Sequence, residues 1–532
     1  MKKIFKTGSP YIWLSGGTLT ISLLMIFGLI ALIMIKGLGI FWPHNITRLM
    51  LNDNSIVLGE IAKTEPIPNH KDSYRTKLKV GNRDIFGMDF RWVDNSRIIS
   101  QDSPTTALTI ERREWGNMYG FLKGMKHDNT VEPMNLSDLK PLLKDSNILY
   151  KNIRHIEKKE IGKINHKMEK LRLALKSMEN EPQSDNTIKR IGTINTKVEA
   201  LEKIYTEKVD TLTNLYASTK EKEVVIELAD GRKETLSVFQ IVRIYDPNRM
   251  SIYAKSRFYV LKFWEFVSAE PREANTEGGV FPAIFGTVIM VLIMSLVVTP
   301  LGVITAVFLR EYTSDNIFSR IVRISVNNLA GVPSIVFGVF GLGFFIYFIG
   351  GGIDKLFYSD TLPTPTFGTG GILWASLTLA LLTVPVVVVA TEEGISSVPN
   401  SLKEASYGLG ATKFETLWRI TLPQATPGIL TGMILAMARA AGEVAPLMIT
   451  GVVKLAPSLP LDSYSPFIHL ERKFMHLGFH IYDVGFQSPN VEAALPMVYT
   501  TTLILIFTVL VLNLVAIIAR NKLRKKYATS AL

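Results

Sequence analysis

Six apolar stretches, each long enough to cross a membrane as a helix, are the feature that most constrains the fold of this 532-residue chain. A bilayer core of about 30 Å needs roughly 20 consecutive apolar residues in helical form. The stretches lie near residues 12–35, 281–309, 326–350, 371–391, 426–452 and 494–519. They predict an α-helical integral membrane protein with six transmembrane helices.

The first apolar stretch resembles a signal peptide in one respect, because Lys2, Lys3 and Lys6 precede it. However, its apolar run is longer than the usual core of a signal peptide. No small-x-small cleavage pattern follows it before Lys36. We therefore expect residues 1–36 to be a retained N-terminal transmembrane helix.

The basic residues predict how the chain is oriented. With a cytoplasmic N-terminus, fourteen Lys and Arg residues flank the spans on the cytoplasmic side, and four lie in the short outer loops. Cytoplasmic loops of membrane proteins carry such an excess. We therefore expect a multi-pass protein of the inner (cytoplasmic) membrane with both termini in the cytoplasm. The net charge of +12 then reflects topology and gives no reason to expect nucleic-acid binding.

A long insertion separates the first two spans, at residues 37–279, and parity places it outside the membrane in the periplasm. Alternating runs such as YRTKLKV, and KEVVIELADGRKETLSV with its Asp-Gly turn, predict strands. Between them, apolar residues at three- and four-residue steps predict an antiparallel helical hairpin at about 148–217. The expected insertion is an α/β domain in which the hairpin is a structural spacer and no catalytic constellation appears.

The polar loop between spans four and five, at 396–424, carries a spaced motif. It reads Glu404-Ala405-Ser406, then Gly410, then Ile420-Thr421-Leu422-Pro423. Asn400 or Ser401 is a candidate helix cap. The glycines at 408 and 410 are expected to separate two short helices, and Pro423 is expected to end the second. This pattern predicts a rigid knob on the cytoplasmic side, although an ordinary connection or a helix lying on lipid would also fit.

This motif resembles the cytoplasmic loop of permease subunits of ABC importers, with every spacing kept and Ser406 in place of an alanine. In that family the loop forms a coupling helix that docks into the ATPase subunit. The resemblance therefore assigns ATPase coupling to Glu404, Ala405, Gly410, Leu422 and Pro423. It also implies the type I ABC importer permease fold for a core at 280–520, followed by a cytoplasmic tail at 521–532.

Three stretches, NNLAGVPSIVFGVFG, the loop itself and ARAAGEVAPL, narrow the resemblance to phosphate importer permeases of the PstA type. The long insertion resembles an extended form of that subunit, and the resemblance gives the insertion no function. The implied partners are a sister permease of PstC type, an ATPase dimer of PstB type, a periplasmic phosphate-binding protein of PstS type and membrane lipid.

Two charged residues, Arg439 and Glu443, lie close to the middle of the fifth apolar stretch. One charge at the centre of a bilayer costs at least about 2.5–3.5 kcal/mol. Their spacing predicts one helix face, where each offsets part of the other's desolvation. They are either a structural ion pair or a site where Arg439 attracts an oxyanion and Glu443 competes for the guanidinium. The residues alone leave both open, and the resemblance favours the substrate pathway.

A proline in the third stretch, Pro333, predicts a broken helix there. A break at membrane depth is tolerated where the backbone lines a cavity. Ser334 and Asn328, with Asn327, are therefore candidate pathway residues that offer neutral hydrogen bonds. A simple packing kink is the alternative.

Several function classes lack their motifs in this sequence. No P-loop occurs, so ATP hydrolysis is expected from another subunit and this chain is not expected to be an enzyme. The absence of cysteine excludes thiolate sites, and no metal-ligand spacing or cofactor motif stands out. The alternatives are a permease for another oxyanion, sulfate or molybdate, and a membrane sensor with a periplasmic ligand domain.

Overall fold

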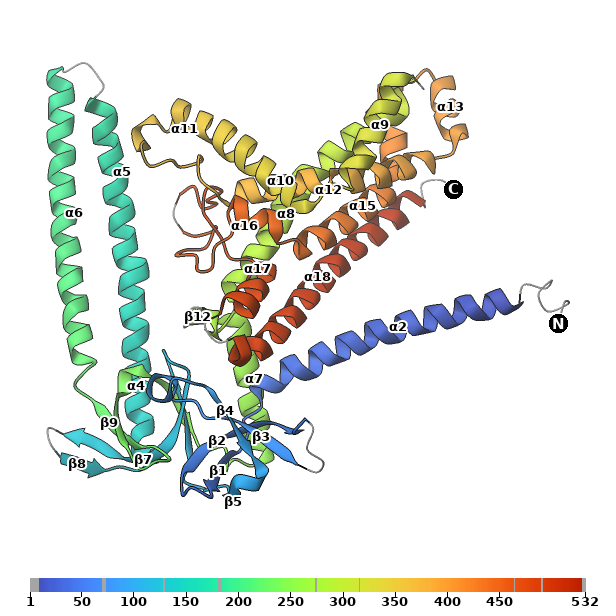
Figure 1. The fold of residues 1–532 in the computed structure, drawn as a ribbon. Coiled ribbons are helices and arrows are strands. Elements are labelled where there is room, and N and C mark those ends of the chain that lie inside the picture. The colour runs from blue at the N-terminus through green and yellow to red at the C-terminus, as the bar shows by residue number, and fades with distance from the viewer. Residues whose placement is uncertain are drawn as a thin grey trace. The chain divides into compact units, whose positions relative to one another are not determined.

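The computed structural model describes residues 9–68, 73–127, 130–179, 184–272, 275–314, 316–463, 465–488 and 491–528. It divides into two compact units (Figure 1). One, the membrane unit, comprises Met1–Ile40 and Phe266–Leu532, and the other, the insertion unit, comprises Phe41–Glu265. Each unit has its own hydrophobic core, and the two are described separately below.

Among the residues that the structure describes, six helices of the membrane unit are long and apolar enough to cross a bilayer, which confirms the six predicted spans. They are Tyr11–Phe41, Phe281–Tyr312, Ser334–Phe357, Ile372–Ser396, Lys413–Gly442 and Val491–Lys525. The first corresponds to α2 (Ser9–Leu38) and the last to α18 (Val491–Ala528). The second comprises α8 (Phe281–Val307) and the π-helical turn η6 (Phe308–Tyr312).

The fourth span, α12 (Ile372–Ser396), is the most buried of the six and packs against the second and fifth spans. Small residues bring these helices close together. A Cβ atom on Gly428 would lie only 2.6 Å from the Cα of Gly394, and one on Gly302 would lie 2.6 Å from a methyl of Val387. Because lipid tails are as apolar as the side chains, close backbone packing of this kind contributes much of the association between membrane helices.

The boundaries of two spans differ from the sequence-based prediction. Helix α9 (Ile317–Leu329) ends before the third span, which starts at Ser334 with α10 (Ser334–Phe340) and continues through η7 (Gly341–Gly350) and α11 (Gly351–Phe357). The fifth span ends at Gly442, and a separate short helix α16 (Ala445–Thr450) follows it. In both places the helix ends four residues before a proline, Pro333 or Pro446, whose ring would clash with the carbonyl at that position.

The described part of the insertion unit contains two antiparallel sheets. One has the strand order β4-β3-β2-β1-β5 and the other β10-β9-β7-β6-β11, with β8 paired to β7. Their bounds are β1 Ile46–Leu51, β2 Ile56–Pro66, β3 Tyr74–Lys79, β4 Phe90–Asp94, β5 Ile98–Asp102, β6 Leu108–Arg112, β7 Asn117–His127, β8 Thr130–Pro133, β9 Glu223–Glu227, β10 Lys233–Ser237 and β11 Ile241–Tyr245. The predicted turn between β9 and β10 is present, with Gly231 at φ +84°.

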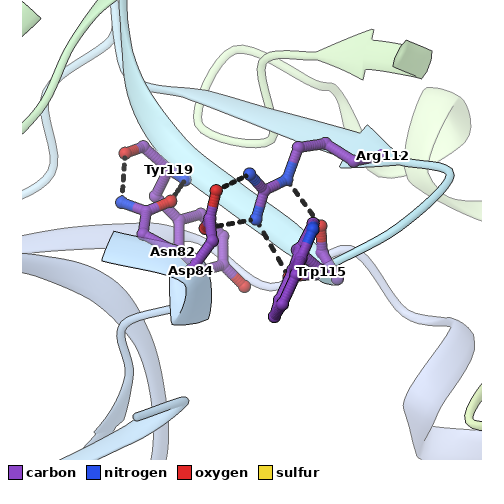
Figure 2. Close-up of polar contacts among 6 residues, drawn as sticks. Asn82, Asp84, Arg112, Trp115 and Tyr119 are labelled. Carbon is purple, nitrogen blue, oxygen red and sulfur yellow. Dashed lines mark hydrogen bonds and ion pairs between the residues drawn. The ribbon is translucent and has the colours of Figure 1, made fainter. Parts of the chain in front are cut away.

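A buried arginine of the second sheet holds the segment that connects β3 to β4 of the first sheet (Figure 2). Arg112, on β6, donates two hydrogen bonds to Asp84, at 2.7 and 2.9 Å, and one to the carbonyl of Trp115. Asp84 lies on the short helix α3 (Arg83–Phe86). Asn82 completes the junction by exchanging hydrogen bonds with the backbone of Tyr119. A bidentate pair of this kind gives both energy and directional specificity.

The predicted helical hairpin is present, but its first arm begins earlier than expected. The arm runs through α4 (Leu136–His155), a π-helical turn (Ile156–Ile161) and α5 (Gly162–Glu179), and α6 (Asp185–Ser218) returns beside it (Figure 1). Contacts between α5 and α6 include the Arg172–Glu202 ion pair at 3.0 Å. At the start of this arm, α4 packs against the second sheet, where its Leu139 and Leu143 are buried. A further helix, α7 (Ile252–Ser268), joins the two units.

Candidate functional site

The loop between spans four and five folds into two short helices joined by a tight turn. Helix α13 (Asn400–Gly408) is followed by Gly410 at φ +83° and then by α14 (Lys413–Thr416). The residue before α13 is Pro399, and no side chain caps this helix, so the predicted cap by Asn400 or Ser401 is wrong. Helix α14 has a capping box instead, in which Thr412 and Glu415 bond each other's backbone N–H groups.

Polar contacts hold α13 in place. Lys403 forms an ion pair of 2.5 Å with Glu311, in η6 at the end of the second span. The hydroxyl groups of Ser406 and Thr416 lie 2.8 Å apart and are buried between α13 and α14. Ser406 occupies the motif position where the sequence departs from alanine, and the structure gives its hydroxyl a partner that the spacing alone could not reveal.

Beyond these contacts, the outer surface of the loop is apolar and exposed. Leu409, at the turn, is 90% exposed, and the rings of Phe414 and Trp418 stack with their centroids 6.5 Å apart. Glu404 and Ala405 are exposed as well. An exposed apolar surface with a polar surround is typical of a protein interaction site.

The second short helix does not end at Pro423, which corrects the prediction. Helix α14 continues through a π-helical turn, η9 (Leu417–Thr421), into α15 (Leu422–Gly442). In the π-helical turn the N–H of Leu422 bonds to the carbonyl of Leu417, five residues back. This wider register accommodates a proline that lacks the N–H needed for the ordinary helical pattern. The loop is therefore continuous with the fifth span, and Leu422 and Pro423 are half-buried at its start.

The charged pair of the fifth span is present, but its position differs from the prediction. Arg439 Nε lies 3.6 Å from Glu443 Oε1, with the two side chains 34% and 22% exposed. Arg439 is in the last turn of α15, whereas Glu443 follows the helix with extended backbone angles (φ −78°, ψ 136°). The pair therefore does not share the face of one continuous helix, and it marks the break before α16. A cation near a helix C-terminus also interacts favourably with the helix dipole.

The other predicted pathway residues lie at the break before the third span. Pro333 precedes α10, and Ser334 is the first residue of that helix. Asn328 lies in the last turn of α9 and is exposed in this single chain, as is Asn327. The break predicted from Pro333 is therefore confirmed. Among the described residues, no hydrogen bond or ion pair joins Ser334 or Asn328 to the Arg439–Glu443 pair.

Comparisons with known proteins identify the family. A family described as "Binding-protein-dependent transport system inner membrane component" matches residues 298–529. A probable ABC transporter permease of Bacillus subtilis, YqgI, is 32% identical over 48% of this chain and 81% of its own length. The chain belongs to this family of ABC importer permeases.

Other matches are shorter or more distant. The phosphate transport system permease PstA 1 of Mycobacterium tuberculosis is 38% identical, over 35% of this chain and 55% of its own length. A crystal structure of the MetNI methionine ABC transporter is similar at 17% identity, covering 46% of this chain and 94% of that one, with a TM-score of 0.32. The family assignment therefore depends on the sequence matches.

Family membership decides between a transport subunit and a membrane sensor, which the sequence left open. An ABC importer permease is a membrane-embedded transport subunit without ATPase activity, so the chain is not an enzyme. The sensor alternative is not retained. The matched region, 298–529, begins within the second span and includes all of the four spans that follow it.

The segment between spans five and six contains polar residues that the sequence patterns did not single out. Lys454 pairs with the buried Asp483 at 3.2 Å, and Asn275 donates to the carbonyl of Lys454. His476 and His480, around α17 (Leu477–Tyr482), are buried. Burial lowers the pKa of His476 to about 3 and that of His480 to about 4, so both are neutral at physiological pH. No group of residues in the described ranges has the arrangement of a metal site.

Proposed function

We propose that this chain is the PstA-type permease subunit of an ATP-driven phosphate importer. The observation that carries the proposal is the partly exposed guanidinium of Arg439 at the end of the fifth span. Buried neighbours of small volume, Ala436, Ala440 and Ala441, surround it on the helix. Ionisable groups at membrane depth usually face a bundle interior or a water-filled path. The phosphate permeases among the relatives support the choice of substrate.

The geometry of the pair suits transient binding of an oxyanion. Glu443 approaches Arg439 at Nε, and at 3.6 Å the separation is longer than a normal hydrogen bond. The two terminal nitrogens of the guanidinium are then free to form a bidentate pair with a phosphate. Glu443 competes for the same cation, which keeps the bound anion from being trapped. Ser334 and Asn328 would supply neutral hydrogen bonds along the path.

The proposed complex contains this chain, a PstC-type sister permease, two PstB-type ATPase subunits and a PstS-type phosphate-binding protein outside the membrane. Both termini and the loop 396–424 lie in the cytoplasm, and the insertion lies in the periplasm. The exposed surface of Leu409, Phe414 and Trp418, with Glu404 and Ala405 beside it, docks into an ATPase subunit. ATP binding brings the ATPases together, and the loop transmits that movement to open the path outward.

The test is uptake of labelled phosphate and labelled sulfate in cells that lack their own importers and express the complete complex. We expect phosphate uptake that requires an active ATPase and persists in excess sulfate or molybdate. A complex with a catalytically inactive ATPase is the matched control. Uptake of sulfate or molybdate in preference to phosphate would overturn the proposed substrate.

A further inference from the structure

We infer that the Glu311–Lys403 ion pair is the direct link through which movement of α13, the first helix of the loop 396–424, reaches the second span. This inference rests on the proposed function, because it assumes that the ATPase moves the loop. Glu311 lies in η6, at the end of the second span, and Lys403 lies in α13. Their charged atoms are 2.5 Å apart, and the side chains are only 14% and 16% exposed.

The two halves of the loop are attached to the membrane unit in different ways. Helix α14 runs without interruption through η9 into the fifth span, so its movement is passed on by the helix itself. Leu417 of η9 also packs in a buried apolar cluster with Val307 and Ile395, from the second and fourth spans. This half of the loop is therefore fixed by the backbone and by hydrophobic packing.

Helix α13 has much weaker apolar attachment. Its one buried residue is Ser406, whose hydroxyl contacts Thr416. The Ser406 contact leads to the start of the fifth span, whereas in the described ranges Lys403–Glu311 is the polar side-chain contact that leads from α13 to the second span. A force applied to α13 by an ATPase therefore reaches the second span directly through this pair.

Burial makes this pair suited to transmission. An ion pair exposed to water contributes little and exchanges readily with solvent. When one partner of a largely buried pair is removed, the other is left as an uncompensated charge, so the pair resists separation. Loss of the pair should let α13 move without the second span, and ATP would then be hydrolysed without transport.

The experiment measures ATP hydrolysed per phosphate transported by the complete complex in proteoliposomes. The variants are Glu311→Gln, Lys403→Gln and the exchange Glu311→Lys with Lys403→Glu. Lys522→Gln removes one exposed charge from the cytoplasmic end of α18 and is the control. We expect each single variant to raise the ratio by about tenfold, within the usual range of coupling energies between sites, and the exchange to restore much of the coupling.

The amount of assembled complex is measured for every variant. A ratio that stays at the wild-type value, whether or not assembly falls, would overturn the inference, because the pair would then be structural only. The wild-type complex tests the proposed function separately. If it transports another anion, the substrate proposal fails while the ratio is still measured with that anion, and if its ATPase does not bind the loop, the proposed function itself fails.

Discussion

Replacing Gly410 by alanine adds one methyl group at the turn of the loop 396–424 and tests whether the proposed docking of an ATPase subunit depends on the shape of that turn. Gly410 has φ +83°, and a Cβ built on it would meet nothing within 4 Å. The cost of the substitution is therefore backbone strain alone, about 1–2 kcal/mol for an L-residue in a left-handed conformation. That energy lowers the population of the docking-competent turn by about 5- to 30-fold.

A matched control lies two residues away. Gly408 also has open space around its Cβ position, but it ends α13 without a positive φ. Alanine at this position should be neutral or should stabilise the loop by about 0.4–1 kcal/mol, because it restricts the unfolded chain. Asparagine at position 410 tolerates a left-handed conformation better than alanine and should give an intermediate result.

The assay is the affinity of the ATPase dimer for the purified permease complex, measured for the three variants and the wild type. We expect Gly410→Ala to weaken binding about 5- to 30-fold, in proportion to the lost population, and Gly408→Ala to leave binding unchanged. Equal affinities for Gly408→Ala and Gly410→Ala, or a larger loss at position 408, would refute the argument from backbone conformation.

Three further predictions concern other parts of the chain. Arg439→Gln should abolish phosphate uptake while the complex still assembles, and Glu443→Gln should have a milder effect; recovery of uptake and assembly in the double variant would instead identify a structural pair. Removing the outer hairpin, residues 162–218, should leave measurable uptake because α4 stays in its sheet core, and complete loss with normal membrane insertion would contradict this. Because burial lowers the pKa of His476 to about 3, the unfolded chain binds a proton that the folded chain excludes, so stability should fall as pH drops below about 6.5, by up to about 1.4 kcal/mol per pH unit. His476→Asn keeps an acceptor for the N–H of Gly478 and should reduce the difference in melting temperature between pH 7 and pH 5; an unchanged difference would argue against this source.

Local properties of the sequence were enough to predict the spans, the hairpin and the loop motif. Whether a segment of about 20 residues crosses the bilayer depends mainly on its own hydrophobicity. The spans can therefore be predicted without knowing which helices they pack against. The hairpin followed from apolar residues at helical spacing, and Ile164, Met168 and Met178 of that seam are buried. The turn at Gly410 followed from the conformational freedom of glycine.

Tertiary structure decided what each proline does. Pro333 and Pro446 follow the ends of α9 and α15 and stand at the starts of α10 and α16. Pro300 and Pro385 lie inside continuous helices, and a π-helical turn accommodates Pro423. The residue type is the same in every case. Whether a helix breaks depends on whether neighbouring groups satisfy the freed carbonyl and leave room for the ring. The sequence therefore predicted a continuous fifth helix through Glu443, and the structure ends that helix at Gly442.

The partners of the loop also depended on tertiary structure. Glu311 and Lys403 are 92 residues apart, and Ser406 and Thr416 are ten apart, with nothing in the residues between them to indicate their buried contact. Such pairs require the ends of the second, fourth and fifth spans to be packed together, as they are through Val307, Ile395 and Leu417. The sequence by itself specified which segments cross the membrane and where the loop turns, whereas packing determined which side chains hold that loop, because a contact between distant residues has no local signature.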